Sequence, residues 1–183
     1  YNLVGKNIEN YDFMINLAHF KGHAMGGFGG VLKNQSIGIA SANGKAYIHT
    51  AGKTADKNLI WKENRDVPQD HFIEAMAASA QSVHDYFDGK ILYINVMNNL
   101  SVDCDCDNHP ADPEMNDIGI LASTDPVALD QACVDLVFNY PSQDGDDAKS
   151  LIERINSRHG VHIIEHAAAI GLGSREYELV KID

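Results

Sequence analysis

The hydrophobic pattern of the chain alternates between two kinds of segment, and the first kind is a short, nearly unbroken apolar run. "DFMINLAHF" at 12–20 and "KILYINVMNNL" at 90–100 are the clearest examples. Runs of this length between Gly and Asn turn signals favour strands, and unbroken apolar runs favour strands covered on both faces. The pattern predicts strands at residues 12–20, 35–41, 45–50, 90–100, 118–123 and 177–182.

The second kind of segment repeats apolar residues with helical spacing. Between residues 68 and 87 one helical face carries Phe72, Met76, Ala80 and Val83, and the Asp88-Gly89 pair ends the segment. Farther along, Asp125 can cap a helix that has Pro126 at its first position. The pattern predicts helices at residues 68–87, 124–140, 146–160 and 162–173.

Strands that alternate with helices predict an α/β fold, namely a mixed, largely parallel sheet flanked by helices, in a single domain over residues 1–183. The chain enters its first strand pattern almost at once, which favours the C-terminal part of a longer protein or a trimmed chain. Ligands collect beyond the carboxyl ends of strands in such sheets. Three segments begin where a predicted strand ends, and we expect the functional site there: residues 19–34, 103–109 and 123–130.

The first of these segments, "HFKGHAMGGFGGVLKN", is dense in residues that bind ligands. His19, Lys21 and His23 alternate along an extended chain, so their side chains share one face. Imidazoles bind transition metals, and the ammonium groups of Lys21 and Lys33 can act on an anionic substrate beside them. Glycine lets backbone approach a ligand closely, and the ligand-binding candidates are Gly26, Gly27, Gly29, Gly30 and Asn34. The alternative is a glycine-rich connection with solvated side chains.

The second segment places Cys104 and Cys106 in an aspartate-rich loop, "SVDCDCDNH". Neighbouring carboxylates disfavour a thiolate unless a cation is present, and a bound metal would supply that cation. Two cysteines need further ligands, for which His19, His23 and His49 are the candidates. The alternatives are two free thiols or a strained disulfide.

Other residues of the same types have simpler interpretations. Asp103 and Asp125 are candidates for proton transfer, although a helix cap explains Asp125 more simply. Cys133 falls inside a helical pattern and is predicted to lie in the core. His109 is a weaker metal candidate. The remaining histidines are predicted to be ordinary surface or helix-end residues: His71, His84, His159, His162 and His166.

Composition narrows the classes of partner. A formal net charge of −12 without a basic stripe argues against nucleic acid. The chain has no apolar stretch long enough to cross a membrane and no signal-peptide pattern, so no membrane partner is expected. Three cysteines do not make a secreted disulfide framework. We therefore expect a cytoplasmic protein, in which the cationic opening motif binds a small anionic molecule.

The motif "HFKGHAMGGFGGVLKN", together with "VDCDC" and "DIGILASTDPVALDQACVDLV", resembles the uncharacterised iron–sulfur-centre protein family (domain of unknown function 362). The resemblance implies a longer protein with a further α/β segment before the motif. It also implies a ferredoxin-like cysteine cassette, but residues 51–70, where relatives carry that insert, contain no cysteine. An iron–sulfur cluster is therefore not expected in this chain.

The residues favour a metal-binding protein whose cofactor is a transition-metal ion. One hypothesis is a metal-dependent redox or isomerase enzyme acting on a small anionic substrate, because thiolate and imidazole together suit soft or borderline metals. The alternatives are a non-catalytic metal-binding or electron-transfer module, and a structural remnant of an iron–sulfur protein. A homo-oligomer, or association with a preceding segment, is a further expectation.

Overall fold

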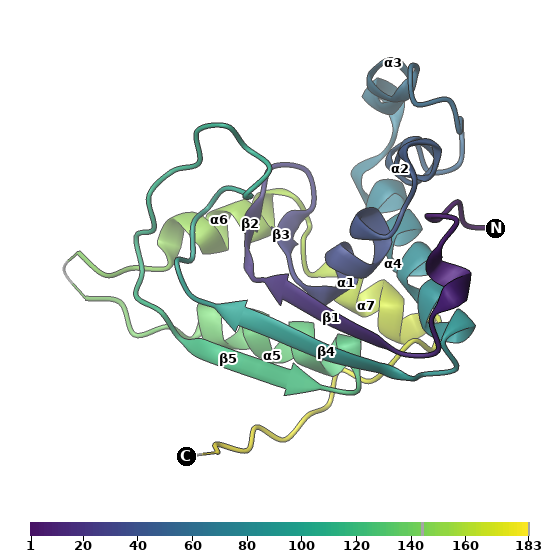
Figure 1. Cartoon of the computed structure of the whole chain (residues 1–183). Helices are drawn as coiled ribbons and strands as arrows, with labels where there is room; N and C mark the ends of the chain where they lie inside the picture. Colours follow the sequence, from purple (N-terminus) through teal and green to yellow (C-terminus); the bar gives the residue numbers. More distant parts are fainter. Residues whose placement is uncertain (144, 183) are drawn as a thin grey trace.

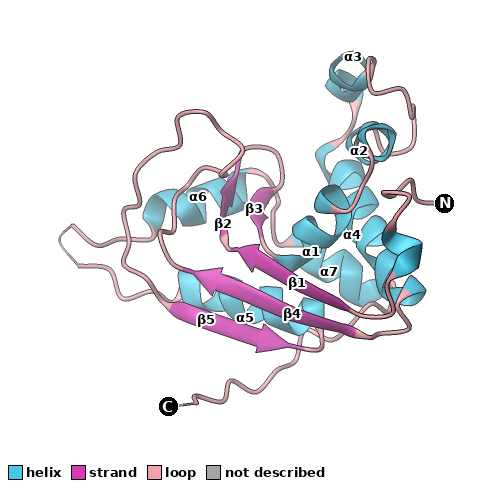
Figure 2. Ribbon diagram, viewed as in Figure 1, coloured by secondary structure: helices cyan, strands magenta, loops and turns pink. Residues whose placement is uncertain are grey.

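The computed structural model describes residues 1–143 and 145–182, and it contains a small mixed sheet with helices packed against it (Figures 1 and 2). The predicted α/β class with a mixed sheet is confirmed. The strands are β1 (Met14–His19), β2 (Lys21–His23), β3 (Gly27–Gly29), β4 (Ile91–Met97) and β5 (Gly119–Ser123). The α-helices are α1 (Val31–Lys33), α2 (Ala42–His49), α3 (Ile60–Glu63), α4 (Gln69–Tyr86), α5 (Pro126–Phe138), α6 (Lys149–Ser157) and α7 (His162–Ala169). Three short turns complete the described elements: η1 (Ile8–Asn10), the π-helical η2 (Asn34–Gly38) and η3 (Asn64–Asp66).

Strand direction decides which loops meet. The main sheet has the order β1-β4-β5, in which β1 pairs parallel with β4 and β5 pairs antiparallel with β4. The carboxyl ends of β1 and β4 therefore lie side by side, since His19 is in register with Val96. Because β5 runs the other way, its last residue, Ser123, pairs with Tyr93 near the start of β4. Residues 19–34 and 103–109 thus share one end of the sheet, and residues 123–130 begin at the other.

Two predicted strands, 35–41 and 45–50, are wrong, because these residues form η2 and α2. The side-chain hydroxyl of Ser41 accepts a hydrogen bond from the amide of Gly44 at 3.1 Å and caps α2, which is a helix-start signal stronger than a short apolar alternation. The predicted strand at 177–182 is also wrong, because these residues lie outside the sheets.

Helices α1 and α5 pack against one face of the main sheet, and α5 lies behind β4 and β5 in Figure 1, whereas α2 and α3 project away from the sheet. On the opposite face Ile15 and Leu17 of β1 are 58% and 61% exposed, and Ile120 of β5 is 71% exposed. The prediction that the first strand is covered on both faces is therefore wrong.

A membrane-spanning helix needs sufficient length and hydropathy, and the part of the chain that the structure describes contains no such helix.

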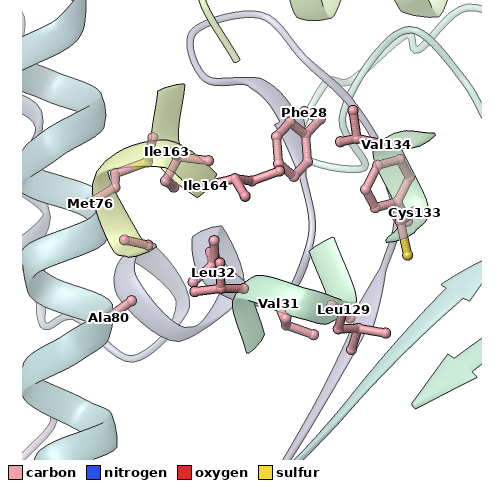
Figure 3. Close-up of a cluster of buried hydrophobic side chains, with 14 of the residues drawn as sticks. Phe28, Val31, Leu32, Met76, Ala80, Leu129, Cys133, Val134, Ile163 and Ile164 are labelled. Atoms are coloured by element: carbon pink, nitrogen blue, oxygen red, sulfur yellow. The ribbon is translucent and has the colours of Figure 1, made fainter. Parts of the chain in front are cut away.

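The core joins the helices to the opening motif. The predicted apolar face of α4 is confirmed, since Phe72, Met76, Ala80 and Val83 are all buried. Figure 3 shows Met76 and Ala80 facing α7 and α1, with Phe28 of β3 beside α5. The predicted core position of Cys133 is confirmed, because its side chain has no exposed surface. This packing fixes α1 and the β2–β3 hairpin relative to the sheet.

Candidate metal centre

The carboxyl ends of β1 and β4 lead into the two segments that carry the predicted ligands. His23 is the last residue of β2, and Cys104 and Cys106 lie in the loop that follows β4. Their ligand atoms all lie within 4.8 Å of one another. His23 and Cys104 are buried, whereas Cys106 is exposed, so the group opens to solvent on one side. All three cysteines of the chain are free thiols in this structure.

Charged side chains hold the cysteine loop against β2. The carboxylate of Asp105 accepts hydrogen bonds from Nζ of Lys21 at 2.8 Å and from Nδ1 of His19 at 3.0 Å. Burial acts to raise the pKa of Asp105, but these bonds from Lys21 and His19 hold it below its usual value. On the other side of the loop Arg154 of α6 pairs with Asp103 at 3.0 Å. The loop is thus anchored from two elements.

His19 lies in this anchor rather than at the sulfur atoms. Its Nδ1 faces Asp105, and its Nε2 lies 2.7 Å from the carbonyl oxygen of Asn98. Both ring nitrogens therefore face acceptor oxygens, so neither nitrogen is directed at the cysteines. The alternation of His19 with Lys21 does bring both side chains to one ligand, but that ligand is the protein's own carboxylate.

His49 lies near His23 but outside the three-residue group. Its Nδ1 donates to the carbonyl oxygen of Lys45 at 2.7 Å, and its ring stacks on Phe72 with centroids 5.1 Å apart. Burial lowers the pKa of His49, while the bond to Lys45 opposes that shift. The lowered pKa favours the neutral ring, which lies buried against Phe72.

The hydrogen bonds of His23 define its tautomer. Its Nδ1 accepts the amide N–H groups of Met25 at 3.2 Å and Gly26 at 2.9 Å, so the neutral ring carries its proton on Nε2. Burial lowers the pKa of His23 to about 3, and the nearby charges of Lys33, Lys21 and Arg154 act in the same direction. The ring is therefore neutral at physiological pH.

Lys33 is the cation that faces the sulfur atoms. Its Nζ lies 3.8 Å from Sγ of Cys104, and the amide of Cys106 donates to the same sulfur at 3.5 Å. Burial and the neighbouring Cys104 raise the pKa of Cys106, and Lys33 opposes that shift. Both donors can stabilise negative charge on the Cys104 sulfur.

The glycines of the opening motif pack against protein atoms. A Cβ at Gly30 would overlap the carboxylate of Asp130, and one at Gly27 would lie 2.7 Å from Cα of Gly160. Gly26 faces Met76 and His23, whereas a Cβ at Gly29 would make ordinary contacts with Lys21 and Lys33. The side-chain amide of Asn34 donates to Asn16 at 2.7 Å. These contacts give the small residues a packing role beside the site.

The two carboxylates predicted for proton transfer lie in different places. Asp103 is beside the cysteine loop and is bound to Arg154. Asp125 caps α5, since its Oδ1 accepts the amides of Val127 at 2.8 Å and Ala128 at 3.0 Å. It lies at the opposite end of the sheet because β5 is antiparallel, and its capping role agrees with the simpler interpretation from sequence.

The comparison with protein families identifies the chain. The model of the family described as "Domain of unknown function (DUF362)" matches residues 1–135. The chain belongs to the DUF362 family. The match confirms the family resemblance drawn from the motifs, while the iron–sulfur association of that resemblance stays a prediction. The matched residues include His23, both loop cysteines and Lys33, and Arg154 lies beyond them. No curated protein and no solved structure matches the chain.

The DUF362 chain does not fit a four-cysteine iron–sulfur cluster by itself. It contains three cysteines, and Cys133 is buried in α5, where the side-chain amide of Asn95 lies 3.3 Å from its sulfur. Two thiols therefore remain beside His23.

Sequence reasoning missed three residues that shape the centre. Asp105 is one acid of an aspartate-rich loop, and Arg154 and Asp130 fall in predicted helices without any motif that marks them as site residues. The one local signal was the position of Asp105 between the two cysteines in the sequence. Arg154 and Asp130 gave no local signal, since their partners are distant in the chain.

We expect His23 to make the stability of the metal-free protein depend on pH. Its pKa is about 3 in the fold and near the ordinary value of 6.5 in the unfolded chain, so protonation favours unfolding as the pH falls below 6.5. The free energy of unfolding should lose about 2 kcal/mol between pH 7 and pH 5 from this group, at about 1.4 kcal/mol per pH unit. Urea unfolding of the parent and of His23→Gln at both pH values measures the difference.

The comparison isolates His23 because other shifted groups are common to both proteins. Burial raises the pKa of Asp130 to about 6, so this group adds stability to the folded protein as the pH falls. It does so equally in the parent and in the variant. Equal losses in the two proteins would contradict a neutral, buried His23.

Proposed function

We propose that this protein binds a soft or borderline transition-metal ion through Cys104 and Cys106, with His23 beside them, and that the ion acts on a small anionic ligand. The observation that carries the proposal is the convergence of the three ligand atoms within 4.8 Å from two separate segments. Thiolate and imidazole donors favour metals such as zinc, copper, nickel or iron over magnesium and calcium.

The two thiolates are the stronger ligands, and His23 has two distinct ways to take part. Its Nε2 becomes a third ligand if its proton leaves, and the amides of Met25 and Gly26 then stabilise the added negative charge on the ring. With its proton retained, Nε2–H is a hydrogen-bond donor for a cysteine sulfur. His23→Gln separates these roles, because glutamine keeps an N–H donor but is a poor ligand for such metals.

The surrounding charges support an anionic ligand. Lys21 is paired with Asp105 and Arg154 with Asp103, so both cations are already neutralised by carboxylates of the cysteine loop. Lys33 instead faces Cys104, where it can pair with an anion bound to the metal. Three protein ligands would leave a coordination position open, as in catalytic sites, whereas structural sites close with four. This favours a redox or isomerase centre over a purely structural one.

The test is metal analysis of anaerobically purified protein beside Cys104→Ser/Cys106→Ser, with Cys133→Ser as the matched control. We expect the double variant to hold about one equivalent of metal less than the parent and the control, because only the cysteine ligands are removed. Cobalt(II) provides a second readout, because a thiolate ligand adds a near-ultraviolet charge-transfer band. Equal metal content in the parent and the double variant would contradict the proposal.

The anion is tested on the cobalt-loaded protein with thiocyanate and acetate as probes. We expect the visible cobalt bands to shift on addition, and Lys33→Gln to weaken the apparent affinity several-fold. The matched control is Lys62→Gln, an exposed lysine on α3. If neither anion shifts the cobalt bands, the anion-binding part of the proposal is contradicted. The result would favour the alternative function, a closed metal-binding module without chemistry of its own.

A further inference from the structure

The packed pair of helices α4 and α7 carries a second group of metal-ligating side chains, away from the cysteines. The group consists of Glu74 on α4 with His162 and His166 on α7, and their ligand atoms all lie within 4.8 Å of one another. The two histidines are four residues apart, so α7 presents them on one face, one turn apart. The sequence pattern alone had placed both on the ordinary surface.

The two imidazoles converge on a single carboxylate oxygen. Nε2 of His162 lies 3.1 Å from Oε1 of Glu74, and Nδ1 of His166 lies 3.9 Å from the same atom. Ligands of a tetrahedral zinc ion, at about 2.0–2.1 Å from the metal, are separated by about 3.3 Å. Small side-chain rotations therefore bring these three atoms to bonding distance of one ion.

The outer contacts of His162 match those of a metal-bound histidine. Its other ring nitrogen, Nδ1, lies 3.5 Å from Oε2 of Glu165, and Arg175 lies 3.5 Å from the other oxygen of that carboxylate. A carboxylate behind the imidazole orients the ring and increases its basicity toward a metal. Glu165 is thus placed as an outer partner of His162.

The group is open to solvent. The side chains of Glu74, His162 and His166 are 27–37% exposed. A surface cavity of about 220 Å³, lined by His159, Gly160, His162 and Glu165 among others, adjoins it. An ion can enter from this side, and water can complete its coordination.

We propose that Glu74, His162 and His166 form a second metal site, which binds a divalent borderline ion such as Zn²⁺ and links α4 to α7. The site also lies next to the turn at residues 158–161, which connects α6 to α7. Gly160 in that turn contacts Gly27, and Gln69 of α4 binds the carbonyl oxygens of Met25 and Arg158 at 2.7 and 2.8 Å. Metal binding here would brace the loop that holds His23.

The competing explanation is an ordinary ion pair between protonated His162 and Glu74. The hydrogen bond to Glu74 raises the pKa of His162, against the opposing effect of burial. An ion pair needs only one histidine, however, and it gives His166 no role in metal affinity. The two explanations therefore differ in what His166→Gln does.

The experiment titrates Zn²⁺ by calorimetry into the Cys104→Ser/Cys106→Ser variant of the 183-residue chain, in which the cysteine ligands are removed. We expect about one equivalent to bind, and at least tenfold weaker binding after adding Glu74→Gln, His162→Gln or His166→Gln. The matched control is His159→Gln, a histidine on the same turn that is 68% exposed and pairs with Asp70, which should change the affinity less than twofold.

The parent protein provides an independent readout with cobalt(II). Ligands of nitrogen and oxygen give visible bands without a sulfur charge-transfer band, so the second site is distinguished from the cysteine site in one spectrum. We expect His162→Gln/His166→Gln to lose the visible bands of the second ion alone. The proposal is overturned if the serine double variant binds no zinc, or if His166→Gln binds it as tightly as its parent does.

Discussion

Replacing Asp130 with alanine is expected to cost about 4 kcal/mol of unfolding free energy, because it removes a buried carboxylate on which three donors converge. The Asp130 side chain is fully buried. Its two oxygens accept the amides of Val31 and Leu32, both at 3.0 Å, and the side-chain amide of Asn95 at 2.7 Å. Alanine would leave the two backbone amides without a partner, each at a cost of about 1–3 kcal/mol before relaxation, and would leave the Asn95 amide only its weaker contact with Cys133.

The matched control is Asp125→Ala, which removes a carboxylate with three comparable bonds from a half-buried position. Asp125 accepts the amides of Val127, Ala128 and Ser174, and water can replace it there. We expect a loss of about 1 kcal/mol, as for a typical helix cap. Urea unfolding measures both variants, and similar losses would show that the burial of Asp130 adds nothing.

The pH dependence gives a second signature of Asp130. Burial raises its pKa to about 6, above the ordinary 3.8 of the unfolded chain, so the folded protein takes up the proton first. The stability contributed by this shift is present below pH 3.8 and is lost as the pH rises through 6. The difference between the parent and Asp130→Ala should therefore be larger at pH 5 than at pH 7.5.

Replacing Gly22 with alanine is expected to damage the candidate centre and the fold together. A Cβ at Gly22 would overlap the backbone carbonyl of Val102, so β2 must move away from the cysteine loop. That movement strains the bond from the Gly22 amide to Ser101 at 2.8 Å and separates His23 from Cys104. We expect a loss of about 3 kcal/mol from overpacking and the weakened hydrogen bond. Metal affinity should fall at least tenfold.

The same hairpin offers a matched control, Gly29→Ala. Gly29 pairs with Lys21, and a Cβ there would lie 3.6 Å from Cε of Lys21, which is an ordinary contact. We expect its unfolding free energy to stay within about 1 kcal/mol of the parent and its metal content to be unchanged. Equal effects of the two substitutions on urea unfolding and on metal content would show that the approach of β2 to the loop is unimportant.

The predictability of the site differed from residue to residue. The residue types in "HFKGHAMGGFGGVLKN" and "VDCDC" predicted two segments that the structure brings together, because side chains able to bind metals are recognisable from chemistry alone. The choice among His19, His23 and His49 was not predictable. Asp105 and the carbonyl oxygen of Asn98 lie at hydrogen-bonding distance from the two ring nitrogens of His19. The backbone amides of Met25 and Gly26 donate hydrogen bonds to one ring nitrogen of His23. The choice depends on these contacts.

The second group of ligands shows the same limit. The spacing of His162 and His166 was visible in "HIIEHAAA", but a pair of histidines on a helix is also typical of an ordinary surface. Glu74 distinguishes the two interpretations, and it lies 88 residues away from His162 in the chain. Only the packing of α4 on α7 brings it there.

The sequence by itself determined the elements with strong local signals: the long helix α4, the capped helix α5, and the strands β1 and β4. These follow from interactions within a few residues, namely apolar periodicity, a capping carboxylate and a proline at the first helical position. Tertiary structure alone decided the antiparallel direction of β5, which sends Asp125 to the far end of the sheet. It also decided that Asp130 accepts hydrogen bonds from the first amides of α1, and that His23 lies close to the two cysteines. Those outcomes depend on which distant surfaces are buried together, and no local pattern contains that information.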